Sequence, residues 1–427
     1  MSLSQKIASL PDQSLQFLHD GYLFQERLRA ARGRDAGDSR PLALRLLGKP
    51  ALLVRGVEGV ELFYDDDRML RHGAMPLPVQ GPLFGQGAVH TLDDEAHRAR
   101  KAQFITISYD DAQVERFKPL LAAEVDKMVQ SLAARPGNVY DATVLAYGRA
   151  ALRWAGVPGD DAEIDPWAVR LGEIVDGFAK LSPAHAKAWL NRRRCDDWYK
   201  GLIEKTRSGE ITPDPQTALA QWAVFTDHEG KQLDAKTAGI ELQNSTRPTI
   251  AVARFAAFAA RALVLHPEFR ERIAAETAER GSLLDGPLAI AFAQEVRRVS
   301  PFVPMLPAFA RKDFTYQGEQ VRKGQRVLID ILGTNTDPQE WDEPRRFNPD
   351  RFLGVDGEQV AAFVPQGGSS VYTGHRCPGE KIAVTCLSAT VAALSSPGVE
   401  LETGGLEFSW TVMPTRPDSG VRVRVAA

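Results

Sequence analysis

The sequence holds few cysteines, namely Cys195, Cys377 and Cys386 in 427 residues. An odd number excludes complete pairing into disulfides and is typical of a reducing compartment, so we expect a cytoplasmic location. An excess of charge of one sign is also missing, because 52 Lys and Arg stand against 55 Asp and Glu, a formal net charge of −3. This balance gives no electrostatic reason to expect nucleic acid or an anionic membrane surface as a partner.

Long hydrophobic runs are absent as well. Residues 1–17, MSLSQKIASLPDQSLQF, lack the unbroken apolar stretch of a secretion signal. The most apolar segment, VARFAAFAARALVL, is interrupted by Arg254 and Arg261. A membrane span requires a longer apolar run with few or no charges, so we predict that no segment crosses a membrane.

Helical patterns fill most of residues 94–300, and short strand-like runs flank them. A long helix is predicted from about residue 235 to 265, ending before the His-Pro pair that follows. Strands are expected within 42–65, 314–331, 405–414 and 420–425. The sequence therefore predicts a mainly α fold with small β-sheets. No linker rich in Pro or Ser divides the chain, so residues 1–427 are expected to form a single domain.

An arginine and a proline stand together inside the long helix predicted for 235–265. Pro248 removes a backbone donor and its ring clashes with the preceding turn, which costs about 3 kcal/mol in a helix interior. Arg247 carries a charge that is costly to bury unless it meets an anion. Two interpretations stay open: a structural ion pair with a carboxylate of the protein, or an anchor for an anionic ligand.

The segment FVPQGGSSVYTGHRCPGE, residues 363–380, leads through glycines to a cysteine at the predicted start of a helix. Glycine permits close backbone approach to a ligand, and Pro378 and Glu380 are typical of a first helical turn. Cys377 is therefore predicted at or beside the N-cap, where the helix dipole favours a metal-binding thiolate. A buried thiol, a zinc ligand beside His375 and a nucleophile are the alternatives, but the glycines favour a large planar cofactor.

This segment resembles the haem-binding loop of the cytochrome P-450 superfamily, in which the cysteine is the axial ligand of the iron. EVRR at 295–298 matches the superfamily's Glu-x-x-Arg, and NPDRF at 348–352 resembles its Pro-Glu-Arg-Phe with Asp in place of Glu. The resemblance implies a triangular-prism fold, with haem b between the long central helix and the Cys377 loop. It also implies a buried ion-pair triad that supports this loop, formed by Glu295, Arg298 and Arg351.

The same resemblance implies cations that hold the haem carboxylates. DDEAHRARKAQF, residues 93–104, reads as a helix with acidic residues first. His97, Arg100 and Lys101 on this segment, together with His375, are expected to bind the cofactor. Lys101 stands where the superfamily has Arg. A solvated basic helix face is the alternative interpretation of these cations.

The central helix departs from most cytochromes P-450, because NSTRPTIA at 244–251 has no acid before its threonine. The Arg-Pro pair and LFGQGAVH at 83–90 resemble the bacterial fatty-acid peroxygenases. This resemblance implies that Arg247 anchors a fatty-acid carboxylate, that Pro248 opens the groove for it, and that Phe84 and His90 lie over the haem face. A His at position 90 goes with decarboxylation in that subfamily. An imidazole titrating near pH 6.5 can donate a hydrogen bond to the substrate carboxylate or to a nearby water.

We therefore predict an oxidoreductase: a peroxygenase that uses H₂O₂ to hydroxylate medium- or long-chain fatty acids at Cα or Cβ, or to decarboxylate them to terminal alkenes. Fatty acid and H₂O₂ are the expected partners, and a redox partner is not required. One alternative is a reductase-driven monooxygenase. The other is a non-enzymatic haem sensor or carrier.

Overall fold

Helices make up most of this computed structural model, which describes residues 11–35, 37–178 and 182–426. Residues 1–10 of the segment predicted to lack a secretion signal lie outside these ranges. The helices are α2 (Ser14–Asp20), α3 (Phe24–Ala30), α4 (Gly56–Phe63), α5 (Leu77–Leu83), α6 (Asp94–Phe104), α7 (Asp111–Ala134), α8 (Val139–Trp154), α9 (Asp161–Gly177), α10 (Pro183–Arg207), α11 (Ala218–Val224), α12 (Ala235–Ala251), α13 (Ala253–Leu265), α14 (Pro267–Arg280), α15 (Pro287–Val299), α16 (Ile331–Asn335) and α17 (Glu380–Ser395).

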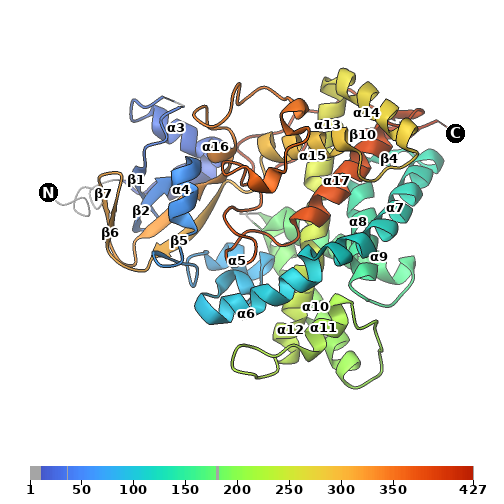
Figure 1. Cartoon of the computed structure of the whole chain (residues 1–427), viewed down its shortest axis with the longest axis horizontal. Coiled ribbons are helices and arrows are strands. Elements are labelled where there is room, and N and C mark those ends of the chain that lie inside the picture. The colour runs from blue at the N-terminus through green and yellow to red at the C-terminus, as the bar shows by residue number, and fades with distance from the viewer. Residues whose placement is uncertain (1–10, 36, 179–181, 427) are drawn as a thin grey trace.

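The strands form three small sheets at the edges of the helical body. Their bounds are β1 (Leu42–Leu46), β2 (Lys49–Val54), β3 (Met69–Leu70), β4 (Gly137–Asn138), β5 (Met305–Ala310), β6 (Phe314–Tyr316), β7 (Glu319–Val321), β8 (Arg326–Asp330), β9 (Val399–Leu401) and β10 (Arg422–Val425). The largest sheet has the order β1-β2-β8-β5-β3, in which only the β2–β8 pair is parallel. Figure 1 shows this sheet with α3 and α4 on one side of the molecule, and the long helices on the other. The predicted mainly α class with small sheets is confirmed.

Two of the predicted strand regions are wrong in part. Residues 56–63, expected within a sheet, form α4, where Gly56, Val60 and Phe63 fall on a buried helical face. Gly56 has φ 73°, which turns the chain sharply out of β2 and into the helix. Residues 405–414 are irregular, and the C-terminal pairing is made instead by β9 and β10.

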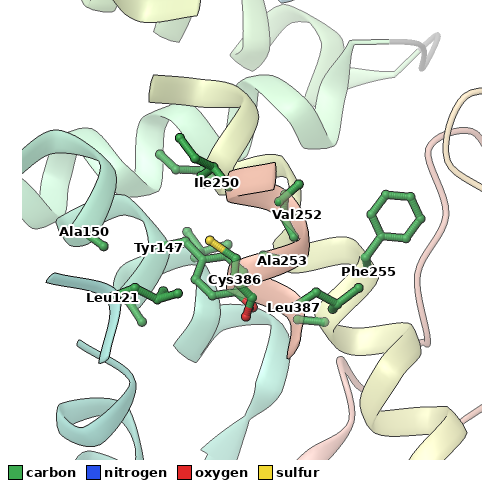
Figure 2. Packing of buried hydrophobic residues seen from close by; sticks show 14 of the residues in the cluster. Leu121, Tyr147, Ala150, Ile250, Val252, Ala253, Phe255, Cys386 and Leu387 are labelled. Carbon is green, nitrogen blue, oxygen red and sulfur yellow. The ribbon is translucent and has the colours of Figure 1, made fainter. Parts of the chain in front are cut away.

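The core lies where α7, α8 and α17 surround the central pair α12 and α13. Figure 2 shows Leu121, Tyr147, Ile250 and Leu387 packed together at this point. The Tyr147 hydroxyl, itself fully buried, lies 3.0 Å from the Cys386 carbonyl oxygen and donates to it. Cys386 is thus a core residue, as its place among apolar neighbours in the sequence predicts.

The predicted long central helix is present as α12 followed directly by α13. Their combined span, Ala235–Leu265, is long and apolar enough to cross a membrane, but 78% of its most apolar window is buried inside the protein. Pro248 lies within α12, and the helix is interrupted only at Val252, four residues later. Because Pro248 has no N–H, the carbonyl of Asn244 receives no helical hydrogen bond from it. The central helix therefore carries a local defect beside Arg247.

The three residues of the expected ion-pair triad are brought together between α15 and the segment before the Cys377 loop. Glu295 and Arg298 are fully buried, with Nε–Oε2 at 2.7 Å and Nη2–Oε1 at 2.8 Å. Arg351 lies 3.3 Å from the same carboxylate. Arg298 also donates to the carbonyls of Asn335 and Pro344. These bonds fasten the Pro-rich segment to α15, which gives the following loop a fixed base.

Candidate haem-binding and active site

A cavity of about 1500 Å³, its opening to solvent included, lies between α12, α6, the 83–90 segment and the Cys377 loop. Within the described ranges, none of its lining residues is Asp or Glu. The polar lining is instead dominated by nitrogen-bearing side chains, namely His90, His97, Lys101, Asn244, Arg247, Gln366, His375 and Arg376. A buried space with cations and no acid is built to receive anionic groups.

Cys377 lines the same cavity as Arg247 and Pro248 of α12. Its position differs from the predicted one, because α17 begins at Glu380 with Gly379 as the N-cap, so Cys377 lies two residues before the cap. Burial raises the pKa of the Cys377 thiol, and the hydrogen bond from the Gly379 backbone opposes this only in part. The helix start therefore does not produce a thiolate by itself. A bound cation such as iron has to supply the remaining stabilisation.

A hydrogen-bond network beside Cys377 directs one donor at its sulfur. The Gln366 Nε2 atom lies 3.8 Å from Cys377 Sγ and donates to it. The Gln366 Oε1 atom accepts from Arg297 Nη2 at 2.7 Å, which fixes the amide so that its NH₂ faces the sulfur. Arg297 also pairs with Glu380, which in turn accepts from Arg376 Nε at 2.7 Å. Glu380 therefore supports the loop rather than capping the helix.

The other end of the loop carries a group of cationic and imidazole side chains. The rings of His97 and His375 are stacked with centroids 3.8 Å apart, and Lys101 donates to the Arg376 carbonyl. Burial, followed by neighbouring cations, lowers the pKa of His97 to about 4, and burial lowers that of Lys101 to about 8. Arg71, whose charge is among these neighbours, has a buried Nη1 without a hydrogen-bond partner in the described part of the chain.

These residues fit a haem. The described residues contain no group of three or more His, Cys, Asp or Glu that could hold a bare metal ion. A single sulfur ligand therefore suits an iron that brings its other ligands with it. Lys101 and Arg71 supply positive charge there, and the imidazoles of His97 and His375, whose lowered pKa values favour the neutral form, supply hydrogen-bond donors for carboxylates. Haem b has both an iron and two propionates.

The position of Arg100 contradicts its expected role. Arg100 is absent from the cavity lining and forms an ion pair with Glu241 of α12 instead, with Nη1–Oε1 at 2.7 Å. On α6, Arg100 precedes Lys101 by one residue, about 100° around the helix, so the two side chains meet different neighbours. Arg100 is a structural residue between α6 and the central helix, not a propionate ligand.

Arg247 lies above the cavity with 3% of its surface exposed. Its Nη2 donates to Asn244 Oδ1 at 3.1 Å, and its Nε has no hydrogen-bond partner among the residues described. Burial, and secondarily the charge of Arg192, lowers the pKa of Arg247 to about 9. No carboxylate pairs with this guanidinium within the described ranges. A structural ion pair, the first of the two interpretations, is therefore wrong.

Phe84 and His90 meet on the same side of the cavity as Arg247. Their rings are 4.2 Å apart between centroids, and the Arg247 guanidinium carbon is 6.0 Å from the Phe84 ring. His90 has an exposed side chain that lines the cavity, and desolvation followed by the Arg247 charge lowers its pKa to about 3. This direction favours a neutral imidazole, which can both donate and accept a hydrogen bond, over the group titrating near pH 6.5 that the sequence suggests.

Several residues of the site escaped the sequence analysis. Glu241 and Asn244 precede Arg247 by six and three residues, so they occupy one side of α12. The spacing is visible in the sequence, but it does not by itself connect a carboxylate six residues away with Arg247. Gln366, Arg297 and Arg71 carry no local pattern, because their partners are distant in the chain. Only the fold brings them to the loop.

Comparison with known proteins agrees with this geometry. Residues 257–394 match the family described as Cytochrome P450. Cytochrome P450 1A1 of Limanda limanda is 36% identical over 132 residues, which cover 28% of this chain and 25% of that protein. The match thus spans a quarter of the length of this curated relative.

Solved structures match over nearly the whole chain. Ligand-free cytochrome P450 OleT is 32% identical with a TM-score of 0.88, covering 97% of this chain and 96% of that one. Cytochrome P450SP alpha (CYP152B1) in complex with (R)-ibuprophen is 34% identical with a TM-score of 0.87, covering 97% and 98%. Cytochrome P450EX alpha (CYP152N1) with myristic acid is 29% identical with a TM-score of 0.85, covering 97% and 96%. The chain belongs to the cytochrome P450 family, in the group that contains OleT and P450SP alpha.

Proposed function

We propose that this protein is a peroxygenase that uses H₂O₂ to oxidise medium- and long-chain fatty acids. The observation that carries the proposal is the buried Arg247, which lines a cavity without a lining carboxylate in the described ranges, together with Cys377 in the lining of the same cavity. Two solved relatives have fatty acids in their structures: a variant of OleT has arachidonic acid, and P450EX alpha has myristic acid. A fatty-acid carboxylate is the anion that such a guanidinium lacks.

The cofactor of this proposal is haem b, whose iron the Cys377 sulfur would bind and whose carboxylates His97, Lys101 and His375 would hold. When bound, haem supplies the iron centre at which the O–O bond of H₂O₂ is broken and a C–H bond is oxidised. Gln366 donates to the sulfur and Arg297 holds that amide in place. The protein's part is to orient the sulfur, neutralise the carboxylates and exclude water.

Arg247 and the substrate together supply the acid–base group. The guanidinium has N–H groups free for a bidentate pair with the fatty-acid carboxylate. Held there, the carboxylate oxygen takes a proton from one oxygen of H₂O₂ and returns it to the oxygen that leaves as water. Hydroxylation then balances as fatty acid plus H₂O₂ to hydroxy acid plus H₂O. Decarboxylation balances as fatty acid plus H₂O₂ to terminal alkene, CO₂ and two H₂O. Arg247 limits attack to the carbons nearest the carboxylate, Cα and Cβ.

The first test is incubation of the purified holoprotein with myristate and H₂O₂, without reductase or NAD(P)H. We expect 2- and 3-hydroxy acids together with a terminal alkene, detected by gas chromatography. Turnover that requires a reductase and NAD(P)H would identify the monooxygenase alternative. Tight haem binding with no turnover under either condition would identify a sensor or carrier.

The acyl chain has an apolar path, because Val175, Phe178, Phe255 and Phe302 line the same cavity.

His90→Gln is expected to shift the products from alkene toward hydroxy acids. His90 is the ring nearest to Phe84, beside Arg247, and one hydrogen bond contributes about 1 kcal/mol, so the ratio should change about fivefold. A histidine with a lowered pKa stays neutral above that pKa. The wild-type ratio should therefore be constant between about pH 6 and pH 8. Gas chromatography of both proteins at both pH values measures this. Equal alkene-to-hydroxy-acid ratios for wild type and variant would show that His90 does not influence which product forms.

A further inference from the structure

The backbone that carries Phe84 and His90 is held to the rest of the site by side chains, not by secondary structure. Residues 84–88 lie between α5 and the short helical turn at 89–91. Four polar side chains form hydrogen bonds with this backbone. Three of them donate to carbonyls: Arg192 Nη1 to Leu83 at 3.4 Å, Asn244 Nδ2 to Phe84 at 3.1 Å and Arg100 Nη1 to Gly87 at 3.2 Å. The fourth, Glu241, accepts from the Val89 N–H through Oε1 at 2.8 Å.

Glu241 is the centre of these contacts. Its carboxylate is fully buried, outside the cavity lining, and its Oε1 atom accepts from Arg100 as well as from Val89. The other oxygen, Oε2, accepts from Asn244 Nδ2 at 3.1 Å. Both oxygens of this carboxylate therefore accept hydrogen bonds: Oε1 accepts from the loop at Val89, and Oε2 accepts from Asn244 on the central helix.

The contact with Glu241 decides which way the Asn244 amide faces. The Asn244 Nδ2 atom has two acceptors, the Glu241 carboxylate and the Phe84 carbonyl, so this end must be the NH₂ group. The opposite end, Oδ1, then faces Arg247 Nη2 at 3.1 Å and accepts from it. An amide turned the other way would present N–H groups to a guanidinium that has only donors.

We infer that Glu241 is a positioning residue that aligns the Arg247 guanidinium with the Phe84–His90 loop for a fatty-acid carboxylate. It acts through Asn244 on Arg247 and through the Val89 N–H on the loop. Glu241 itself touches no substrate. The inference rests on the proposed function only in taking a fatty acid as the ligand. It adds a role for an acid that lies on α12 but outside the cavity.

Glu241→Gln tests this with almost no change in shape. The new side chain has one oxygen that can accept and one NH₂ group that can only donate. The NH₂ group must therefore face other donors, either those of Arg100 and Val89 or the NH₂ of Asn244. We expect the dissociation constant for myristate to rise about tenfold. The measurement is a titration of the Soret band of the holoprotein with myristate. Haem content and the spectrum of the reduced CO complex should match those of the wild type.

Asp337→Asn is the matched control. Asp337 is also fully buried and pairs with an arginine, Arg55, at 3.1 Å, but lies beside the largest sheet and away from the cavity. This variant should lose thermal stability as Glu241→Gln does, while its dissociation constant for myristate stays at the wild-type value. An equal rise in both variants would show a general loss of stability and overturn the inference.

If Glu241→Gln does not accumulate as folded holoprotein, the double variant Glu241→Gln with Arg100→Met removes both buried charges together, and the same tenfold rise is expected. Unchanged myristate binding in whichever variant folds would overturn the inference. The proposed function fails separately, if wild-type protein binds myristate but forms no product with H₂O₂. Wild-type protein that does not bind myristate at all would overturn both.

Discussion

Cys377→His is expected to abolish the red-shifted Soret band that a thiolate-bound haem gives in its reduced CO complex. Cys377 lines the cavity, and the Gln366 amide donates to its sulfur. The histidines of the cavity lining have other neighbours: His97 and His375, for example, stack on each other. An imidazole in its place is a neutral ligand and cannot donate negative charge to iron. The same change should reduce peroxide-driven fatty-acid oxidation about a hundredfold or more.

The controls for this substitution are the two remaining cysteines. Cys195→Ser and Cys386→Ser change thiols that are fully buried, and neither residue lines the cavity. Both variants should keep the wild-type reduced CO spectrum. The assignment of Cys377 is wrong if the thiolate band survives its replacement, or if the band disappears in either control.

Arg247→Ala is expected to remove fatty-acid turnover with H₂O₂ while leaving haem incorporation intact. The substitution takes away a buried guanidinium whose remaining N–H groups have no partner among the described residues. Two hydrogen bonds to a charged partner contribute about 1.5–3 kcal/mol each, so catalytic efficiency should fall about a hundredfold or more. Steady-state rates with myristate and the Soret titration measure turnover and binding independently.

Arg261→Ala is the control for this change. Arg261 follows on the same helical span, donates to the Leu406 carbonyl at 2.9 Å and does not line the cavity. Its replacement should leave turnover unchanged. Fatty-acid oxidation at wild-type rates by Arg247→Ala would exclude the carboxylate anchor.

The sequence predicted the elements that depend on local pattern. The long central helix, the helix after Cys377 and the position of Glu295 beside Arg298 follow from periodicity and i, i+3 spacing, and all are present. The prediction failed where short apolar runs alternating with Gly and Pro suggested strand, since residues 56–63 form a helix. This segment packs against β2 and β8, which are interior strands of the largest sheet, and a local pattern contains no information about such packing.

Within the site, the sequence identified the residues but not all of their partners. Arg100 and Lys101 are neighbours in the chain, yet one pairs with Glu241 and the other lies beside the Cys377 loop. Which of two adjacent cations faces the cofactor depends on how α6 is rotated against α12, and that is a tertiary property. The lowered pKa of His90 is likewise a consequence of burial near Arg247, which no sequence motif expresses.

The absence of any lining Asp or Glu, in the part of the chain that the structure describes, has a consequence for the resting protein. Under the proposed function, no side chain there can take the first proton from H₂O₂ as a carboxylate would. On that proposal, peroxide that enters before a fatty acid arrives meets a site without the substrate's carboxylate, and we expect the protein to consume H₂O₂ slowly in the absence of a fatty acid. The same dependence would protect the protein from oxidising itself, because the oxidant would be activated only when a substrate is bound.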